Sequence, residues 1–395
     1  MDIFTAFVFL TLVVSTTKAF DPCASPSSES KGSDLSVIHV YGQCSPFNQH
    51  KAGSWVNTVI NMASKDPARV TYLSSLVASP KATSVPIASG QQVLNIGNYV
   101  VRVKLGTPGQ LMFMVLDTSR DAAWVPCADC AGCSSPTFSP NTSSTYASLQ
   151  CSVPQCTQLL FRLRQRCLRL DPSAAGAPGA GSWAHVVALT IRVSILWCLL
   201  LLFPSFKSYY FSGSLRLGPL GQPKNIRTTP LLRNPHRPTL YYVNLTGVSV
   251  GRVLVPVAPE LLAFDPNTGA GTIIDSGTVI TRFVEPVYAA IRDEFRKQVK
   301  GPFATIGAFD TCFAATNEDI APPVTFHFTG MDLKLPLENT LIHSSAGSLA
   351  CLAMAAAPNN VNSVLNVIAN LQQQNLRIMF DVTNSRLGIA RELCN

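Results

Sequence analysis

Two stretches of the chain share one pattern: FMVLDTS at residues 113–119 and TIIDSGT at residues 272–278. In each, an apolar run typical of a β-strand ends on an aspartate, and small hydroxyl or glycine residues follow. One such tripeptide is a weak signal, because aspartates in polar turns are common. Two copies in matched strand contexts indicate an internal duplication, in which Asp117 and Asp275 hold equivalent positions.

Paired carboxyl groups at strand ends predict acid–base chemistry. Two carboxyls about 3 Å apart cannot both ionise, so they share one proton, and aspartic proteases are the established example. The charged partner acts as base on a water, while the protonated partner donates to a carbonyl oxygen. Thr118 and Ser276 can hydrogen-bond across to the opposite loop, and Gly277 allows the tight turn that aims the acid inward. Ser119 and Thr278 complete the two turns as supporting residues.

Composition favours a folded chain with two sizeable cores. Its 395 residues are 47% hydrophobic and only 13% charged, which argues against disorder. The formal net charge is +8, and about half of it lies between Arg162 and Arg192. No run of Lys or Arg alternates with aromatic residues, so we expect no nucleic-acid partner.

The first residues indicate a secreted protein. An apolar run from Phe7 to Val14, followed by small residues up to Ala19, predicts a signal peptide over 1–19. Twelve cysteines should then pair as disulfides in an oxidising compartment. A zinc site is the alternative for the C-x2-C spacings, but it needs a fourth ligand and a reducing compartment. The closely spaced disulfide candidates are Cys127, Cys130, Cys133, Cys151 and Cys156.

Several elements can be placed from local pattern. Residues 20–93 lack strong periodicity and are interpreted as a propeptide that covers a site. A hairpin is expected from Tyr99 to Leu116, with its turn at 106–109. A second strand region covers 240–257, and a helix after Asp275 should bury Val287, Ile291 and Phe295. Asn141 and Asn244 stand in N-x-[ST] glycosylation sequons, so both should lie at the surface.

Residues 158–205 fit neither half of this duplication. The run Val186–Phe203 is almost wholly apolar, with one charge at Arg192, and is a membrane-helix candidate by hydropathy. A buried apolar segment is the alternative. A span inside a lobe would place Cys127 and Asp275 on opposite sides of a bilayer, so membrane association is not expected.

At these motifs the chain resembles the plant pepsin-family (A1) aspartic proteases, in the nepenthesin-like or apoplastic nucleoid-DNA-binding-like subgroup. The matching blocks are 98–108, 116–127, 143–146, 271–278, 366–375 and 380–390. The resemblance implies an all-β, bilobal fold with a cleft between lobes, and Asp117 and Asp275 as the catalytic pair. It also implies that Thr118 and Ser276 lock the two loops, and that Cys312 and Cys351 form a bridge. A secreted, monomeric zymogen that hydrolyses protein or peptide substrates in the apoplast is implied, with no cofactor and no metal.

The chain departs from the family at three places. The flap hairpin of the family carries a tyrosine after the cysteine-rich stretch, yet 158–205 contains none. The first lobe, 94–157, is short beside the second, 206–395, and lacks the strand that should clamp the loop of Asp117. Arg120 stands where relatives have a small hydroxyl residue, and should favour an ionised Asp117. These departures leave one alternative function, a catalytically impaired homologue that binds peptides or proteins. The abrupt edges of 158–205 favour a gene-model error or a decayed copy.

Overall fold

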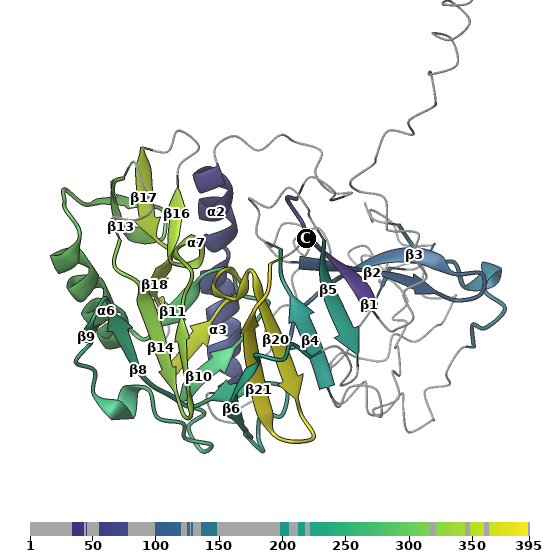
Figure 1. Cartoon of the computed structure of the whole chain (residues 1–395). Helices are drawn as coiled ribbons and strands as arrows, with labels where there is room; N and C mark the ends of the chain where they lie inside the picture. Colours follow the sequence, from purple (N-terminus) through teal and green to yellow (C-terminus); the bar gives the residue numbers. More distant parts are fainter. Residues whose placement is uncertain are drawn as a thin grey trace, which may run out of the picture.

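The described part of the chain is built mainly from β-strands in three sheets. The computed structural model describes residues 34–42, 45, 55–77, 99–119, 125–126, 128, 136–147, 198–204, 212–217, 222–315, 321–343, 348–358 and 363–393. The all-β class expected from the sequence is confirmed, with helices confined to the flanks and centre (Figure 1).

A thirteen-stranded sheet connects the two halves of the described chain. Across it lie β18 (Met354–Ala356), β11 (Thr281–Phe283), β19 (Leu365–Ile368), β10 (Gly271–Ile274), β7 (Tyr242–Val243), β6 (Arg227–Leu232), β21 (Arg386–Arg391), β20 (Leu376–Asp381), β4 (Cys198–Leu202), β5 (Ser212–Leu217), β1 (Asp34–His39), β2 (Tyr99–Leu105) and β3 (Gln110–Val115).

Two four-stranded sheets complete the second lobe. One contains β12 (Ala304–Ile306), β13 (Phe309–Ala314), β17 (Leu349–Leu352) and β16 (Leu341–His343), and the other β15 (Met331–Lys334), β14 (Val324–Phe328), β8 (Leu245–Val250) and β9 (Val253–Leu254). The helices are α2 (Trp55–Ala63), α3 (Asp66–Val77), α6 (Glu285–Gln298) and α7 (Leu337–Thr340), and short 3-10 turns cover Pro140–Thr142, Pro259–Leu261 and Asn370–Gln373.

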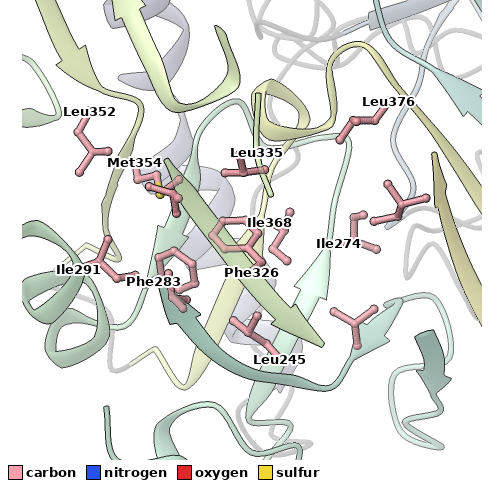
Figure 2. Packing of buried hydrophobic residues seen from close by; sticks show 14 of the residues in the cluster. Leu245, Ile274, Phe283, Ile291, Phe326, Leu335, Leu352, Met354, Ile368 and Leu376 are labelled. Carbon is pink, nitrogen blue, oxygen red and sulfur yellow. The ribbon is translucent and has the colours of Figure 1, made fainter. Parts of the chain in front are cut away.

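The core of the second lobe forms where α6 packs on the sheets. Val287, Ile291 and Phe295 recur every four residues and are fully buried, as their spacing predicted. Figure 2 shows Ile291 beside Phe283, with Phe326 and Ile368 nearby in the same cluster. Burying one such side chain contributes about 1.5–3 kcal/mol, so this cluster anchors the strands that carry Asp275.

The expected first hairpin is present as β2 and β3. Its register runs from Val100 opposite Val115 to Leu105 opposite Gln110. The turn uses Gly106 at a φ of 81°, a conformation that favours glycine. Leu116 and Asp117 directly follow the hairpin's second strand.

Where it is described, the stretch expected to be a propeptide, residues 20–93, is more regular than its weak periodicity indicated. Strand β1 inserts between β5 and β2, with Val37 opposite both Val101 and Gly213. Helices α2 and α3 lie in the middle of the molecule beside the second-lobe strands (Figure 1). On α2, the residues Val59, Met62 and Ala63 pack against Val279 and Ile280. These apolar contacts are tertiary, which is why local pattern alone missed the helices.

The C-terminal end of the apolar run Val186–Phe203 is a buried strand, which agrees with the buried-segment alternative and not with the membrane-helix candidate. Cys198–Leu202 form strand β4, which pairs with β20 on one side and β5 on the other. Leu200 and Leu201 are both fully buried, because a central strand is apolar on both faces and reads as a continuous hydrophobic run. In the ranges that the structure describes, no helix has the length and apolar character needed to cross a membrane.

Candidate active site

Asp117 and Asp275 both lie at the ends of strands, and the fold brings them together. Asp275 follows β10, whose four residues are all buried, and its N–H donates to Ile368 O on the parallel strand β19 at 2.9 Å. Asp117 lies two residues after β3, where the Leu116 N–H donates to Tyr99 O at 2.8 Å. The side chain of Asp117 is 14% exposed and that of Asp275 only 1%.

The two loops are tied to each other by reciprocal hydrogen bonds. The Thr118 N–H donates to Ser276 Oγ at 3.1 Å, and the Ser276 N–H donates to Thr118 Oγ1 at 3.0 Å. Ser276 Oγ also donates to Leu116 O at 3.0 Å. Thr118 and Ser276 are buried, so these bonds are shielded from competing water and fix the spacing of the acids.

The supporting hydroxyls repeat in both loops. Ser119 Oγ donates to Asp117 Oδ1 at 2.8 Å, and Thr278 Oγ1 donates to Asp275 Oδ2 at 2.6 Å. A Cβ on Gly277 would lie 2.9 Å from Asp117 Oδ1, so only glycine allows the two loops to approach this closely. Each acid therefore accepts a hydrogen bond from a hydroxyl of its own loop, two residues after Asp117 and three residues after Asp275.

Arg69 of α3 lies between the two carboxylates. Its Nη1 and Nη2 donate to the two oxygens of Asp117, each at 2.7 Å. The same Nη2 lies 2.9 Å from Asp275 Oδ1, so the distance between these Asp117 and Asp275 oxygens cannot exceed the sum of the two contacts. Although burial opposes the charged form, Asp275 and Asp117 raise the pKa of Arg69 above its ordinary value. The guanidinium is therefore a charged group that fills the space between the acids.

Sequence reasoning did not identify Arg69. The propeptide was expected to cover a site, but no motif marked which residue enters it. The available sequence signal was the Asp-Pro pair at 66–67, which is typical of a helix start. In the structure Val70, Leu73 and Ser74 are buried, so Arg69 lies on a partly buried helix.

The two acidic loops differ in their support. Asn370 Nδ2 donates to Ser276 O at 2.9 Å, and Gln373 Nε2 donates to Asp275 O at 3.3 Å. Around Asp117, β3 is the last strand of the sheet among the described residues. Beyond Tyr99 and the loop's own atoms, the bonds shown at Leu116–Ser119 come from Ser276 and Arg69, so the first loop depends more on α3.

The other residues singled out from the sequence have mixed outcomes. Cys312 and Cys351 form a disulfide between paired positions of β13 and β17. Asn141 is exposed, and Asn244 is half-buried with its Nδ2 donating to Thr329 Oγ1 at 2.8 Å. No group of three or more potential metal ligands occurs in the ranges the structure covers. Arg120 and the cysteines of the N-terminal cluster lie outside the described residues: Cys127, Cys130, Cys133, Cys151 and Cys156.

A second hydrogen-bonded row joins Ser249, His327 and Asp332. Ser249 Oγ and His327 Nε2 are 2.7 Å apart, and His327 Nδ1 lies 2.8 Å from Asp332 Oδ1. Ser249 lies inside β8 between β14 and β9, so the backbone N–H groups of this region are used in strand pairing. A nucleophile of acyl transfer needs donors for an oxyanion, and we interpret this row as a cross-strand contact.

Comparisons with known proteins agree with the geometry. Residues 99–177 match the family described as "Xylanase inhibitor N-terminal", and residues 240–391 match "Xylanase inhibitor C-terminal". Aspartyl protease AED3 of Arabidopsis thaliana is 56% identical over 98% of both chains. Aspartyl protease 25 of Oryza sativa subsp. japonica is 45% identical, covering 92% of this chain and 95% of the relative.

Solved structures show the same fold at low identity. The structure of edgp aligns with a TM-score of 0.56 at 16% identity, covering 75% of this chain and 92% of that one. Basic 7S globulin from soybean aligns with a TM-score of 0.54 at 15% identity, covering 74% and 93%. The alignment with AED3 spans 447 positions against 395 residues here, so at least 52 of its positions have no counterpart in this chain.

Proposed function

This chain belongs to the family of plant pepsin-like aspartyl proteases, and from that membership we propose that it is a secreted endopeptidase whose catalytic pair is Asp117 and Asp275. The supporting observation is that a single nitrogen, Arg69 Nη2, lies 2.7 Å from one carboxylate and 2.9 Å from the other. A water at that place would contact both acids. Such a water has the position needed for attack on a peptide carbonyl.

The proposed mechanism divides one proton between the two acids. The ionised carboxylate removes a proton from the water, and the protonated carboxyl donates to the carbonyl oxygen as the tetrahedral centre forms. Ser119 and Thr278 each donate to one carboxylate oxygen of the acid in their own loop, and the reciprocal bonds of Thr118 and Ser276 maintain the separation of the acids. The proton then passes to the leaving nitrogen as the peptide bond breaks.

In the full chain this site is latent. Arg69 of α3 occupies the place of the attacking water, and α2 and α3 pack on second-lobe residues beside the site. We propose that these elements belong to the propeptide expected over residues 20–93 and that proteolysis releases it. The signal peptide predicted over 1–19 and the disulfide Cys312–Cys351 are consistent with the proposed folding in the secretory pathway.

The test is peptide hydrolysis at acid pH after processing of the secreted full chain. Asp275→Asn and Asp117→Asn should each lower kcat by about 10²–10⁴-fold, since each removes a proton-transfer group. Pepstatin should block the wild-type activity. Hydrolysis that survives both substitutions would refute the assignment.

A catalytically impaired, peptide-binding homologue is the alternative. It is favoured by the 52 or more relative positions without counterpart and by the lack of tyrosine in residues 158–205. A flap excludes water and positions substrate, so its loss lowers turnover. Under this alternative, the processed protein binds pepstatin but releases no product from any peptide.

A further inference from the structure

We propose that the backbone N–H groups of Val279 and Ile280, together with Arg282, form a carboxylate-binding subsite in the cleft, which selects substrates that carry an acidic side chain. The inference deepens the proposed protease function and rests on it for the identity of the ligand as a peptide. In the full chain Asp66 of the prosegment occupies this subsite.

Asp66 shows how the subsite holds a carboxylate. Its Oδ1 accepts the Val279 N–H at 3.0 Å, and its Oδ2 accepts the Ile280 N–H at 3.0 Å. Arg282 Nε lies 4.0 Å from the same Oδ2. The side chain of Asp66 is only 2% exposed. Two converging donors and a cation match a carboxylate, which has two acceptor oxygens and a negative charge.

Arg282 supplies the charge selectivity. It is 4% exposed, and its Nε has no hydrogen-bond partner within the described structure. Nη1 donates to Ala356 O at 3.0 Å, whereas Nη2 donates to Ala63 O, which belongs to the prosegment. Release of residues 34–77 therefore removes both the carboxylate and one carbonyl from Arg282. A sheltered cation that has lost its anion favours a replacement anion over a neutral group.

The ionisation of Asp66 reflects the same balance. Burial raises the pKa of Asp66 to about 6, while Arg282 and the two backbone donors oppose that rise. A carboxylate in this place is therefore ionised at neutral pH despite being sheltered from water. A substrate carboxylate that enters the open cleft is less buried, so it meets the same donors with a smaller desolvation penalty.

The subsite adjoins the catalytic pair. Val279 lies four residues after Asp275, on the segment that leaves the catalytic loop. Asp66 and Arg69 are three residues apart on α3, so they share a helix face and enter neighbouring places in the cleft. A substrate strand advances about 3.3 Å per residue, so its acidic residue would lie a few positions from the scissile bond.

The first experiment uses the full-length protein and needs no catalysis. Asp66→Ala empties the subsite, and acetate should then raise the melting temperature of this variant saturably. Acetamide, the neutral isostere, and chloride at equal ionic strength should not. Asp66→Ala combined with Arg282→Gln should lose the acetate effect, and wild type should show none. Equal responses to acetate and acetamide would overturn the inference. If Asp66→Ala folds poorly, its refolding yield with each additive gives the same comparison.

The second experiment reads specificity after processing of the full chain. Peptides that differ only by Glu or Gln are scanned along the positions flanking the cleaved bond. One position should show at least a tenfold higher kcat/KM for Glu, and Arg282→Gln should bring that ratio close to one. An unchanged ratio overturns the subsite. If wild type cleaves no peptide, the proposed protease function fails, whereas acetate rescue of the Asp66→Ala chain still decides the carboxylate subsite.

Discussion

At the scale of single residues, the site of the full chain combines two carboxylates with one guanidinium cation. Arg69 makes six hydrogen bonds with Asp117, Ser119 and Asp275 through its three guanidinium nitrogens. These charge-assisted bonds lie in a sheltered cleft, where they are stronger than in water. One guanidinium thus both neutralises the carboxylate pair and excludes the water that the pair would activate.

Replacing Arg69 should therefore unlock the site without cutting the chain. Arg69→Gln leaves two facing carboxylates without a cation, and loss of one partner of a buried pair costs about 3–5 kcal/mol. We expect a lower melting temperature at neutral pH and measurable pepstatin binding by the unprocessed protein. The exposed Arg233→Gln serves as the matched control and should change neither. Absence of pepstatin binding in folded Arg69→Gln would show that the helices, rather than Arg69, close the cleft.

The pH response of docking is set partly by His39 on β1. Burial lowers its pKa from 6.5 to about 4. The released strand therefore takes up a proton as pH falls below 6.5, whereas the docked strand stays neutral until about pH 4, so acidification weakens docking within this window. The full effect is on the order of 3 kcal/mol. Thermal unfolding of His39→Gln should depend less on pH between 6.5 and 4 than that of wild type.

Asp66 acts in the opposite direction. Its pKa is raised from 3.8 to about 6, so its contribution to docking is present below pH 3.8 and is lost as pH rises through 6. In Asp66→Asn this opposing contribution is gone, and stability should fall more steeply on acidification than in wild type. A shallower fall in this variant would contradict the sign argued here.

At the scale of secondary structure, α3 is held mainly by one apolar contact surface. Leu73 is fully buried and packs with Leu240, Tyr242 and Ile273 of the second lobe. This surface positions Arg69 one turn earlier and Asp66 two turns earlier on the same helix. Apolar burial of α3 therefore fixes the positions of two charged side chains, Arg69 and Asp66.

Truncating that surface should weaken latency. Leu73→Ala should destabilise the docked helix by about 2–5 kcal/mol through lost burial and the cavity left behind. The expected result is faster cleavage of α3 by an added protease. The unprocessed chain should also bind pepstatin at a lower pepstatin concentration than wild type does. Thr71→Ala on the exposed face of the same helix is the control and should behave as wild type. Equal cleavage rates for both variants would contradict the role of this contact.

At the scale of the whole molecule, the two loops of the site have unequal foundations. The loop of Asp275 is held by hydrogen bonds to β19 and from Asn370 and Gln373. Strands from all three sheets lie in this lobe. The hairpin β2–β3, which leads to Asp117, joins the large sheet through β1, a strand of the proposed prosegment. The sheet position of the hairpin that carries Asp117 therefore depends on β1, whereas β10 and β19 pair with each other without it.

Hydrogen exchange should reveal this difference. Amides of Tyr99–Val115 should lose protection when residues 34–77 are cut away, because β2 then loses its neighbour β1. Amides of Leu365–Asp381 should keep theirs, since β19 and β20 pair with second-lobe strands or β4. The measurement is mass spectrometry on processed and unprocessed protein. Equal loss in both regions would indicate that the molecule responds as one unit.

Local pattern was sufficient for those elements whose burial follows their own periodicity. The hairpin from Tyr99 and the helix carrying Val287, Ile291 and Phe295 were predicted because alternation and four-residue spacing are readable in a single sequence. Strand β4 was not, because a strand buried on both faces and an apolar helix have the same composition. Helices α2 and α3 were missed because their stability comes from contacts with distant residues.

The sequence by itself determined the membership in an all-β protease family, the pairing of Asp117 with Asp275 as a hypothesis, and the hydroxyl residues that flank them. These follow from repeated local motifs, in which strand, acid and turn are adjacent along the chain. Only the tertiary structure decided what lies between the acids and beside them: Arg69 in the catalytic place and Asp66 on Val279, Ile280 and Arg282. Those contacts join residues 48 to 216 positions apart, and such separations along the chain are bridged only by the packing of whole elements.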